Sequence, residues 1–286
     1  LGKSSVIMGT TVAIGTLVIY GLSSVFAMFD MFKLSFYTAA FLDLIVAVLW
    51  IFLYRKAFKC AYEEKEKEVI SHNNETKKEK SFENDKVDKS IIYITIFVLC
   101  LYAVIVNLTK DGLTTWVPSI LKENFAMSDS VSILLTLTLP IVAIFGNLAA
   151  LKTHKIIPDY ITHCFVVFII IGGIVGVIIA GISQTQIIFT LAGLMFVNFM
   201  ASSLNSLITS IFPIFMRAKV NSGLLAGILN GFCYAGSTIS SYGLGLVADS
   251  FGWISVFWLL IGCCIFAGIA WCIYSCVRYI LCVRGR

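Results

Sequence analysis

Charged residues are scarce in this sequence of 286 residues. Lysine, arginine, aspartate and glutamate together make up 13% of it, against about 25% in soluble domains. Hydrophobic residues make up 59%, and the mean hydropathy is +0.94. So little charge excludes an ordinary soluble protein. We therefore predict an all-α integral membrane protein that lies in a lipid bilayer.

Motifs of soluble enzymes are also absent. The sequence has no GxGxxG or P-loop before a soluble helix, no HExxH, no GxSxG and no carboxylate pair in a soluble domain. The nine cysteines lie nearly all inside apolar runs, with no CxxC pattern and no histidine at a metal-ligand spacing. We therefore predict no enzyme activity, no metal site and no cofactor.

A nucleic-acid partner is not indicated either. The net charge is +5, but the lysines and arginines are scattered over short loops and do not gather on one soluble face. No secretory signal peptide is evident, because Leu1 to Lys3 lead directly into a span-length apolar segment. The sequence also lacks an initiator methionine. We expect the chain to be a fragment of a longer protein.

What the sequence does contain is a series of apolar runs of about 20 residues, the length that crosses roughly 30 Å of hydrocarbon. We predict eight spans with approximate limits 5–27, 34–54, 90–109, 130–150, 158–181, 186–211, 221–247 and 253–277. If Lys3 is cytoplasmic, the opposite side holds only Lys33, Lys110 and Lys122 among the basic residues. This asymmetry predicts a plasma-membrane protein in which both ends of the chain are cytoplasmic.

One highly charged segment interrupts the apolar runs. Residues 55–89 hold ten of the 21 basic and nine of the 16 acidic residues. We predict a solvated cytoplasmic linker, either partly helical through its Glu and Lys pairs or disordered. The linker divides the chain into two helices within residues 1–54 and a six-helix bundle within residues 90–286.

The stretch from Asn107 to Pro118 is unusually polar for the end of an apolar run. It contains Lys110, Asp111 and three threonines, and we expect the chain to turn at Trp116 and Pro118 near the membrane surface. An ionisable side chain at membrane depth is costly, so Lys110 is a candidate functional residue. A lysine that snorkels to the surface is the alternative.

Four of the last six spans carry polar residues at helical spacing, which places each set on one helix face. The sets are Asn107, Lys110 and Thr114; Ser132, Thr136, Pro140 and Asn147; Asn198, Ser202, Asn205 and Thr209; and Asn230, Tyr234, Ser237 and Ser241. Such residues can bond across helix contacts, each contributing about 0.6 to 2 kcal/mol. Because lipid-facing amides would be unsatisfied, four such faces favour a shared polar cavity over helix–helix bonding.

Small residues recur four apart in the fifth and seventh spans. They are Gly172, Gly176 and Ala180, and Gly223, Gly227, Gly231 and Ala235. We predict that they let helix backbones approach closely, with bending points as the alternative.

A charged linker followed by six spans resembles the region in which the two six-helix halves of major facilitator superfamily proteins are connected. Within that superfamily, Lys110-Asp111-Gly112 with Trp116 and Pro118 resembles the organophosphate:phosphate antiporters, which carry sugar phosphates and glycerol phosphate. A second set resembles them too: Pro213, Ala226-Gly227, Gly231-Phe232, Tyr234, Gly236, Gly245, Asp249 and Phe251-Gly252-Trp253. The resemblance covers nearly the whole chain and is most specific over 105–121 and 213–257. It implies the major facilitator fold, with these eight helices as the fifth to twelfth of twelve and most of the N-terminal half lying outside this chain.

The resemblance also implies a function. Lys110 stands where those antiporters have an arginine that faces the cavity and binds phosphate. We expect secondary active transport of a small organic anion, such as a phosphorylated sugar or polyol, by alternating access, with phosphate or a proton as counter-substrate. Lys110 would neutralise the anion, and further substrate contacts would come from Asn107, Asn198, Asn205, Asn230 and Tyr234. The alternatives are a permease for another small solute and a transporter-like sensor that signals through the linker.

Four further charged residues are weaker candidates for gating or coupling: Asp43, Asp111, Arg217 and Asp249. Asp43 is alone in the middle of the second apolar span, where it is either a proton-coupling group or a neutral carboxyl bonded to a neighbouring helix. The other three stand near membrane faces or beside Lys110.

Overall fold

The computed structural model describes residues 2–29, 31–71 and 86–284, and nearly all of these are helical. The helices follow the apolar runs of the sequence, because a backbone in lipid must satisfy its polar groups internally. They are α1 (Gly2–Met28), α2 (Phe32–Ser71), α3 (Lys86–Phe125), α4 (Asp129–Thr136), α5 (Thr138–Ile156), α6 (Tyr160–Ser183), α7 (Ile187–Ser206), α8 (Phe212–Phe215), α9 (Ser222–Ile239), α10 (Gly245–Phe251) and α11 (Trp253–Arg284). Three short turns join some of them: the π-helical segments η1 (Leu207–Ile211) and η3 (Ser240–Leu244) and the 3₁₀ turn η2 (Met216–Ala218).

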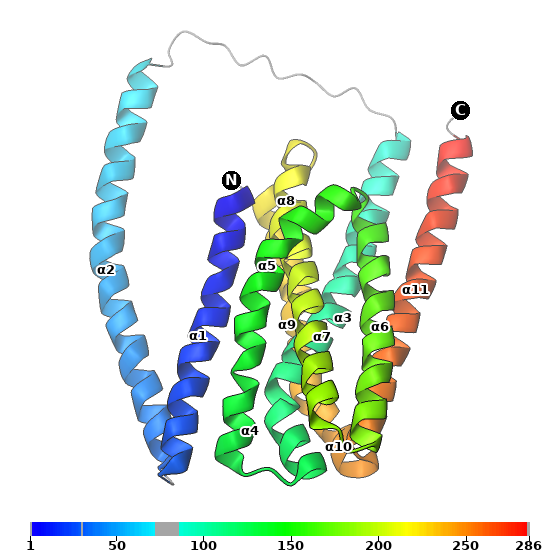
Figure 1. Ribbon diagram of the computed structural model, residues 1–286. Helices are drawn as coiled ribbons and strands as arrows, with labels where there is room; N and C mark the ends of the chain where they lie inside the picture. Colours follow the sequence, from blue (N-terminus) through cyan, green and yellow to red (C-terminus); the bar gives the residue numbers. More distant parts are fainter. Residues whose placement is uncertain (1, 30, 72–85, 285–286) are drawn as a thin grey trace.

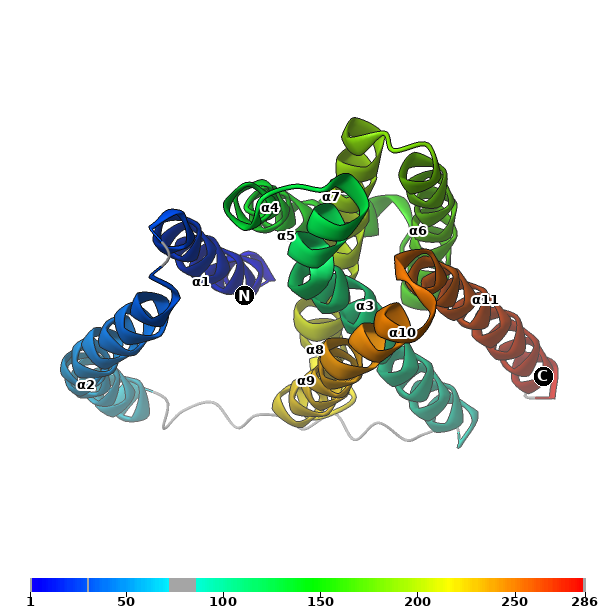
Figure 2. The same ribbon diagram turned by 90° about the horizontal axis from the view of Figure 1, so that it is seen from below.

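The helices run side by side in one upright bundle, and the start of α1 and the end of α11 lie at the same end of it (Figure 1). Viewed along the bundle, α3 is in the middle, with α4, α7, α9, α6 and α11 around it (Figure 2). α1 packs against α4 and α5, and α2 stands outside α1. The fold therefore places α3 where it can touch most of the bundle.

The described residues contain seven helical stretches that are long and apolar enough to cross a membrane. An eighth stretch, formed by α9, η3 and α10, runs beside α3 and belongs to the same bundle. It carries Asn230, Tyr234 and several serines and is not among the seven. The described residues thus form an all-α membrane protein with eight helical stretches in the bundle, and the predicted spans 130–150, 186–211 and 221–247 are each assembled from more than one helical segment.

Part of the predicted charged linker, residues 55–89, lies in helices. α2 continues to Ser71 and α3 begins at Lys86, so both ends of the predicted linker are helical. Residues 72–85 lie outside the described residues. Glu and Lys are good helix formers, and an apolar helix that leaves the membrane can extend through them.

The predicted turn at Trp116 and Pro118 is wrong. α3 runs unbroken from Lys86 to Phe125, with Pro118 inside it, so the polar stretch lies within a helix. A proline has no N–H and frees the carbonyl oxygen four residues earlier. Here that carbonyl belongs to Thr114, and the Tyr20 hydroxyl of α1 donates a hydrogen bond to it at 3.2 Å. A bond from another helix thus compensates for the proline.

The closest approaches between helix backbones are not at the predicted glycines, of which only Gly172 meets another described helix, at Cys264 of α11. A methyl group added at Gly176, Gly227 or Gly231 would meet no atom within 4 Å among the described residues. At Gly236 it would collide with the carbonyl oxygen of Val104 in α3, and at Gly146 with that of Phe199 in α7. In the helix pairs α3–α9 and α5–α7, the backbone of one helix therefore packs against a glycine of the other, at positions outside the predicted sets of small residues.

The core beside α3 is anchored by Tyr102, which is fully buried. Its ring meets Phe168 of α6 edge-on at 5.3 Å, and its hydroxyl donates to the carbonyl oxygen of Ala267 in α11 at 3.0 Å. A buried tyrosine needs such a partner for its hydroxyl. One side of α3 is thereby held against α6 and α11, while α9 and α7 pack on its other sides.

Candidate substrate-binding cavity

A cavity of about 500 Å³ opens between α1, α3, α5, α7, η1 and α9. Its volume lies within the range of roughly 300–1,000 Å³ that is common for small-ligand sites. All six residues that the sequence proposes as substrate contacts line it: Asn107, Lys110, Asn198, Asn205, Asn230 and Tyr234. The structure thus brings them together at one site, whereas their role as substrate contacts stays a prediction.

The polar faces of four helices form most of the lining. Every member of the sets on α3 and on α7 with η1 lines the cavity, as do Asn230, Tyr234 and Ser237 of α9. The set in the fourth span divides, because Pro140 and Asn147 line the cavity but Ser132 and Thr136 are buried elsewhere. A helix places residues three or four apart on one face, which is why sequence spacing finds these residues.

Two π-helical segments adjoin this lining. η1 follows Asn205 in α7, and η3 follows Ser237 in α9. An extra residue in a turn shifts the helix face that comes after it, and π-helical turns are frequent at functional sites. Thr209 inside η1 lines the cavity, whereas Ser241 inside η3 does not, although its spacing predicts it.

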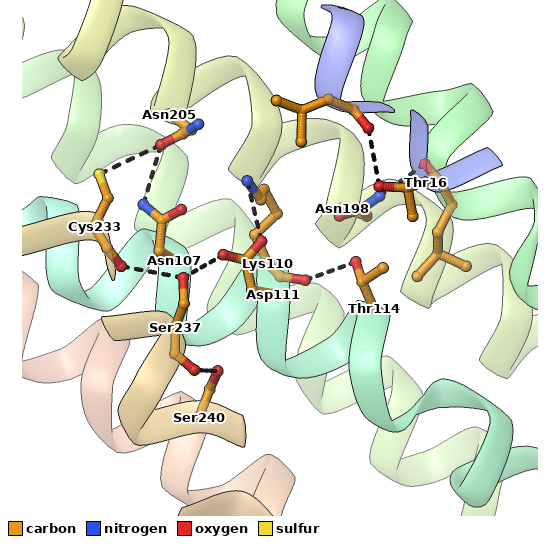
Figure 3. A network of polar contacts seen from close by, with 12 residues as sticks. Thr16, Asn107, Lys110, Asp111, Thr114, Asn198, Asn205, Cys233, Ser237 and Ser240 are labelled. Atoms are coloured by element: carbon orange, nitrogen blue, oxygen red, sulfur yellow. Dashed lines mark hydrogen bonds and ion pairs between the residues drawn. The ribbon is translucent and has the colours of Figure 1, made fainter. Parts of the chain in front are cut away.

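Lys110 and Asp111 are the only charged side chains among the lining residues of the described chain. Lys110 Nζ lies 3.1 Å from Asp111 Oδ1, and the two side chains are 19% and 34% exposed. The Ser237 hydroxyl of α9 donates to the other carboxylate oxygen, Oδ2 of Asp111 (Figure 3). The carboxylate therefore connects the lysine on α3 to α9, and the cavity wall carries one positive and one negative charge.

An amide network joins three helices next to this pair. Asn107 Nδ2 donates to Asn205 Oδ1 at 3.0 Å and to the carbonyl oxygen of Ala103 at 3.0 Å. Cys233 Sγ of α9 lies 3.6 Å from the same Asn205 oxygen (Figure 3). These contacts connect α3, α7 and α9 through groups that lipid could not satisfy.

The wall near α5 is built differently. Asn198 Nδ2 donates to the carbonyl oxygen of Leu139 at 2.8 Å, and the Ser206 hydroxyl donates to Asn147 Oδ1 at 2.8 Å. Asn198 Oδ1 and the Ser202 hydroxyl are buried and have no hydrogen-bond partner within the described residues. This part of the wall is neutral and has unused polar atoms.

The amino-acid sequence was compared with known families and proteins. Residues 1–222, which are 222 of the 286 residues, match the family model described as Major Facilitator Superfamily. The chain belongs to the major facilitator superfamily. It is therefore a multi-pass secondary transporter of some small solute, and membership in this superfamily favours transport over enzyme activity. A comparison with curated proteins gives no match.

The match to the superfamily ends at the first residue of α9. α1 to α7, which supply Asn107, Lys110, Asn198 and Asn205, lie inside the matched region, whereas Asn230 and Tyr234 lie beyond it. This match does not distinguish the organophosphate:phosphate antiporters from other members of the superfamily.

The weaker gating and coupling candidates of this major facilitator protein do not lie together. Asp111 lines the cavity and contacts Lys110. Asp43 on α2, Arg217 in η2 and Asp249 on α10 are exposed, and none of the three lines the cavity. Their roles in gating or coupling stay predictions.

Seven lining residues were neither in the sets nor among the charged candidates that the sequence predicts, and three of them carry a hydroxyl or a thiol: Thr16, Ser210 and Cys233. Thr16 of α1 lines the cavity, and its hydroxyl donates to the carbonyl oxygen of Val12 at 2.9 Å. Cys233 was interpreted as a membrane-buried apolar residue. Its position three residues after Asn230 and four before Ser237 places it on the polar face of α9, so the spacing signal was present.

Proposed function

We propose that this major facilitator protein is a secondary active transporter of a small organic anion, for which a phosphorylated sugar or polyol is the leading candidate. Phosphate or a proton would move as counter-substrate. The observation that carries the proposal is Lys110, the single cationic side chain of the described lining, placed in the wall of a cavity of about 500 Å³. A charged side chain at membrane depth is energetically costly, and an anionic ligand would offset that cost.

The geometry around Lys110 supports this role. A lysine ammonium has three donor hydrogens, and the contact with Asp111 at 3.1 Å uses one of them. The remaining donors are available to a carboxylate or phosphate in the cavity. Lysine binds such groups as a point charge, without the planar two-point geometry of arginine. The site therefore accepts anions of varied shape.

The neutral lining would orient the rest of the solute. Asn107 and Asn205 hold each other across α3 and α7, and Asn230 and Tyr234 face the cavity from α9. Alternating access would then expose this site to each membrane side in turn, as helices rock around a fixed site. We further propose a plasma-membrane location with both ends of this chain cytoplasmic, which the distribution of lysine and arginine supports.

Uptake of labelled glycerol phosphate or glucose 6-phosphate into liposomes that contain the protein tests the proposal. We expect Lys110→Gln to lower kcat/KM about 10- to 100-fold, because a hydrogen bond to a charged group contributes about 1.5–3 kcal/mol. Lys110→Arg retains the charge and should retain uptake.

Lys122→Gln is the matched control. Lys122 lies 2.7 Å from Asp129 in a pair that is more than half exposed, and it does not line the cavity. This variant should transport like the wild type, since exposed ion pairs contribute little. Unchanged uptake by Lys110→Gln would remove Lys110 as the anion ligand.

A second candidate function follows from the Lys110–Asp111 ion pair itself. Because the pair makes the formal charge of the lining zero, it also suits a solute that has no net charge, with Lys110 as a structural group. Uptake of labelled glycerol that persists in Lys110→Gln would favour this permease over the anion transporter.

A further inference from the structure

Two polar atoms in the cavity wall have no partner among the residues that the structure describes. They are Asn198 Oδ1 and Ser202 Oγ, which lie one helical turn apart on α7. Both side chains are only 2% exposed, and both residues line the cavity. The other unpartnered polar atoms, in Ser35, Ser132, His154 and His163, belong to residues away from the cavity.

The orientation of the Asn198 amide is set by its neighbour. Only the Nδ2 group can donate to the carbonyl oxygen of Leu139, and it does so at 2.8 Å. Oδ1 is then left as the unused atom, and a carbonyl oxygen can only accept. The Ser202 hydroxyl beside it can donate or accept. A ligand at this position must therefore supply a hydrogen-bond donor.

Asn205, on the same face of α7, shows the opposite arrangement. Its Oδ1 accepts from Asn107 Nδ2 at 3.0 Å and lies 3.6 Å from Cys233 Sγ. Figure 3 draws this network on one side of Lys110 and places Asn198, with Thr16 of α1, on the other. The protein satisfies the Asn205 oxygen, whereas the Asn198 oxygen is buried in the cavity wall without a partner among the described residues.

We propose that Asn198 and Ser202 form a donor-accepting subsite for the solute whose anionic group contacts Lys110. The substrate class is then an organic anion that also bears an O–H or N–H group, in preference to a plain alkyl phosphate or fatty carboxylate. This inference rests on the proposed anion transport and adds the second recognition element of the same site. A buried acceptor discriminates strongly against a ligand that cannot donate to it.

Matched pairs of ligands test the subsite in the purified protein by isothermal titration calorimetry. The O–H arm compares sn-glycerol 3-phosphate with n-propyl phosphate. The N–H arm compares N-acetylglycine with 4-oxopentanoate, which replaces the N–H by a methylene group. In each pair that binds, we expect the donor-bearing member to bind about 10- to 100-fold more tightly, as for the loss of one buried hydrogen bond.

Two variants assign the preference to these residues. Ser202→Ala removes a hydroxyl that makes no hydrogen bond within the described protein, so it should fold, and Asn198→Leu removes the acceptor. In both, the advantage of the donor-bearing ligand should shrink while the affinity of the plain ligand stays unchanged. Ser203→Ala is the matched control, because Ser203 is a neighbouring buried serine of α7 that does not line the cavity. Lys110→Gln should instead weaken both members of a pair equally.

The outcomes separate this inference from the proposed function. Equal binding of the two members in the wild type would overturn the subsite and leave anion transport standing. A preference that persists in both Ser202→Ala and Asn198→Leu would overturn the assignment to these residues. If no member of any pair binds, the proposed anion function fails and the subsite fails with it.

Discussion

The helix pairs α3–α9 and α5–α7 pack in the same way beside one cavity. Gly236 of α9 lies against the carbonyl oxygen of Val104, and Gly146 of α5 lies against that of Phe199. The first pair presents the ion pair of Lys110 and Asp111. The second presents neutral amides and hydroxyls. A glycine contact thus sets the distance between helices, while polar residues within two turns of it, some directly adjacent, decide the chemistry of each wall.

The largest expected effect comes from filling these glycine positions. Gly236→Ala would push a methyl group into Val104, and Gly146→Ala would push one into Phe199. We expect each to lower the free energy of unfolding by about 1–3 kcal/mol through overpacking, measured by thermal unfolding in detergent. Clearly unequal losses of unfolding free energy would show that the two helix pairs do not depend on their glycine contacts in the same way.

Gly231→Ala is the control for both substitutions. Gly231 lies on α9 with no atom within 4 Å of an added methyl group among the described residues. Alanine is a better helix former than glycine by roughly 1 kcal/mol, so this variant should be neutral or slightly stabilised. If Gly236→Ala unfolds at the same temperature as Gly231→Ala, the close α3–α9 contact is not important for stability.

The ion pair is the feature that only the α3–α9 wall has. Asp111→Asn keeps a polar group near Ser237 but removes the charge that holds Lys110. We expect glycerol phosphate to bind about 3- to 10-fold more tightly, because an unpaired ammonium has more to gain from an anion. Titration calorimetry measures the change. Weaker binding would instead identify Asp111 as a direct ligand of the solute.

On the α5–α7 wall the corresponding contact is the hydrogen bond from Ser206 to Asn147 at 2.8 Å. Ser206→Ala should lower the free energy of unfolding by about 1 kcal/mol and leave anion affinity unchanged, since a neutral hydrogen bond contributes about that much. Thermal unfolding and glycerol phosphate titration test both parts. A loss of affinity would show that this wall also positions the solute.

The smallest effect is expected away from both walls, at the membrane surface. Burial raises the pKa of Asp159, but hydrogen bonds from Thr162 and from Arg278, at 2.9 Å each, outweigh burial and hold its pKa below the ordinary value. A lowered folded-state pKa contributes stability above the unfolded pKa of about 3.9, and this stability is lost as pH falls through the folded pKa.

Asp159→Asn should therefore reduce stability at neutral pH and flatten the loss of stability on acidification below about pH 4. The side chains of Asp159 and Arg278 are 37% and 49% exposed, so solvent screening limits the effect to under about 1 kcal/mol. Thermal unfolding at several pH values measures it. An unchanged acid profile would show that Asp159 does not contribute to the pH dependence of stability.

Much of this arrangement could be predicted from local sequence properties. Apolar runs predict spanning helices because backbone groups in lipid have no other partners. Polar residues at helical spacing predicted the six cavity residues, from Asn107 to Tyr234, because spacing alone determines a helix face. The assignment to the major facilitator superfamily was also available from residue patterns, and the family match confirms it.

The tertiary structure decided what depends on partners distant in the sequence. The turn expected at Pro118 is absent, because Tyr20 of α1 supplies a hydrogen bond to Thr114 from 94 residues away. Gly236 is a contact point and Gly231 is not, because only one faces Val104. Asn198 and Asn205 occupy the same helix face, and sequence cannot tell which amide is satisfied. That depends on which groups the neighbouring helices bring within hydrogen-bond distance, because polar atoms in a membrane protein are satisfied across helices.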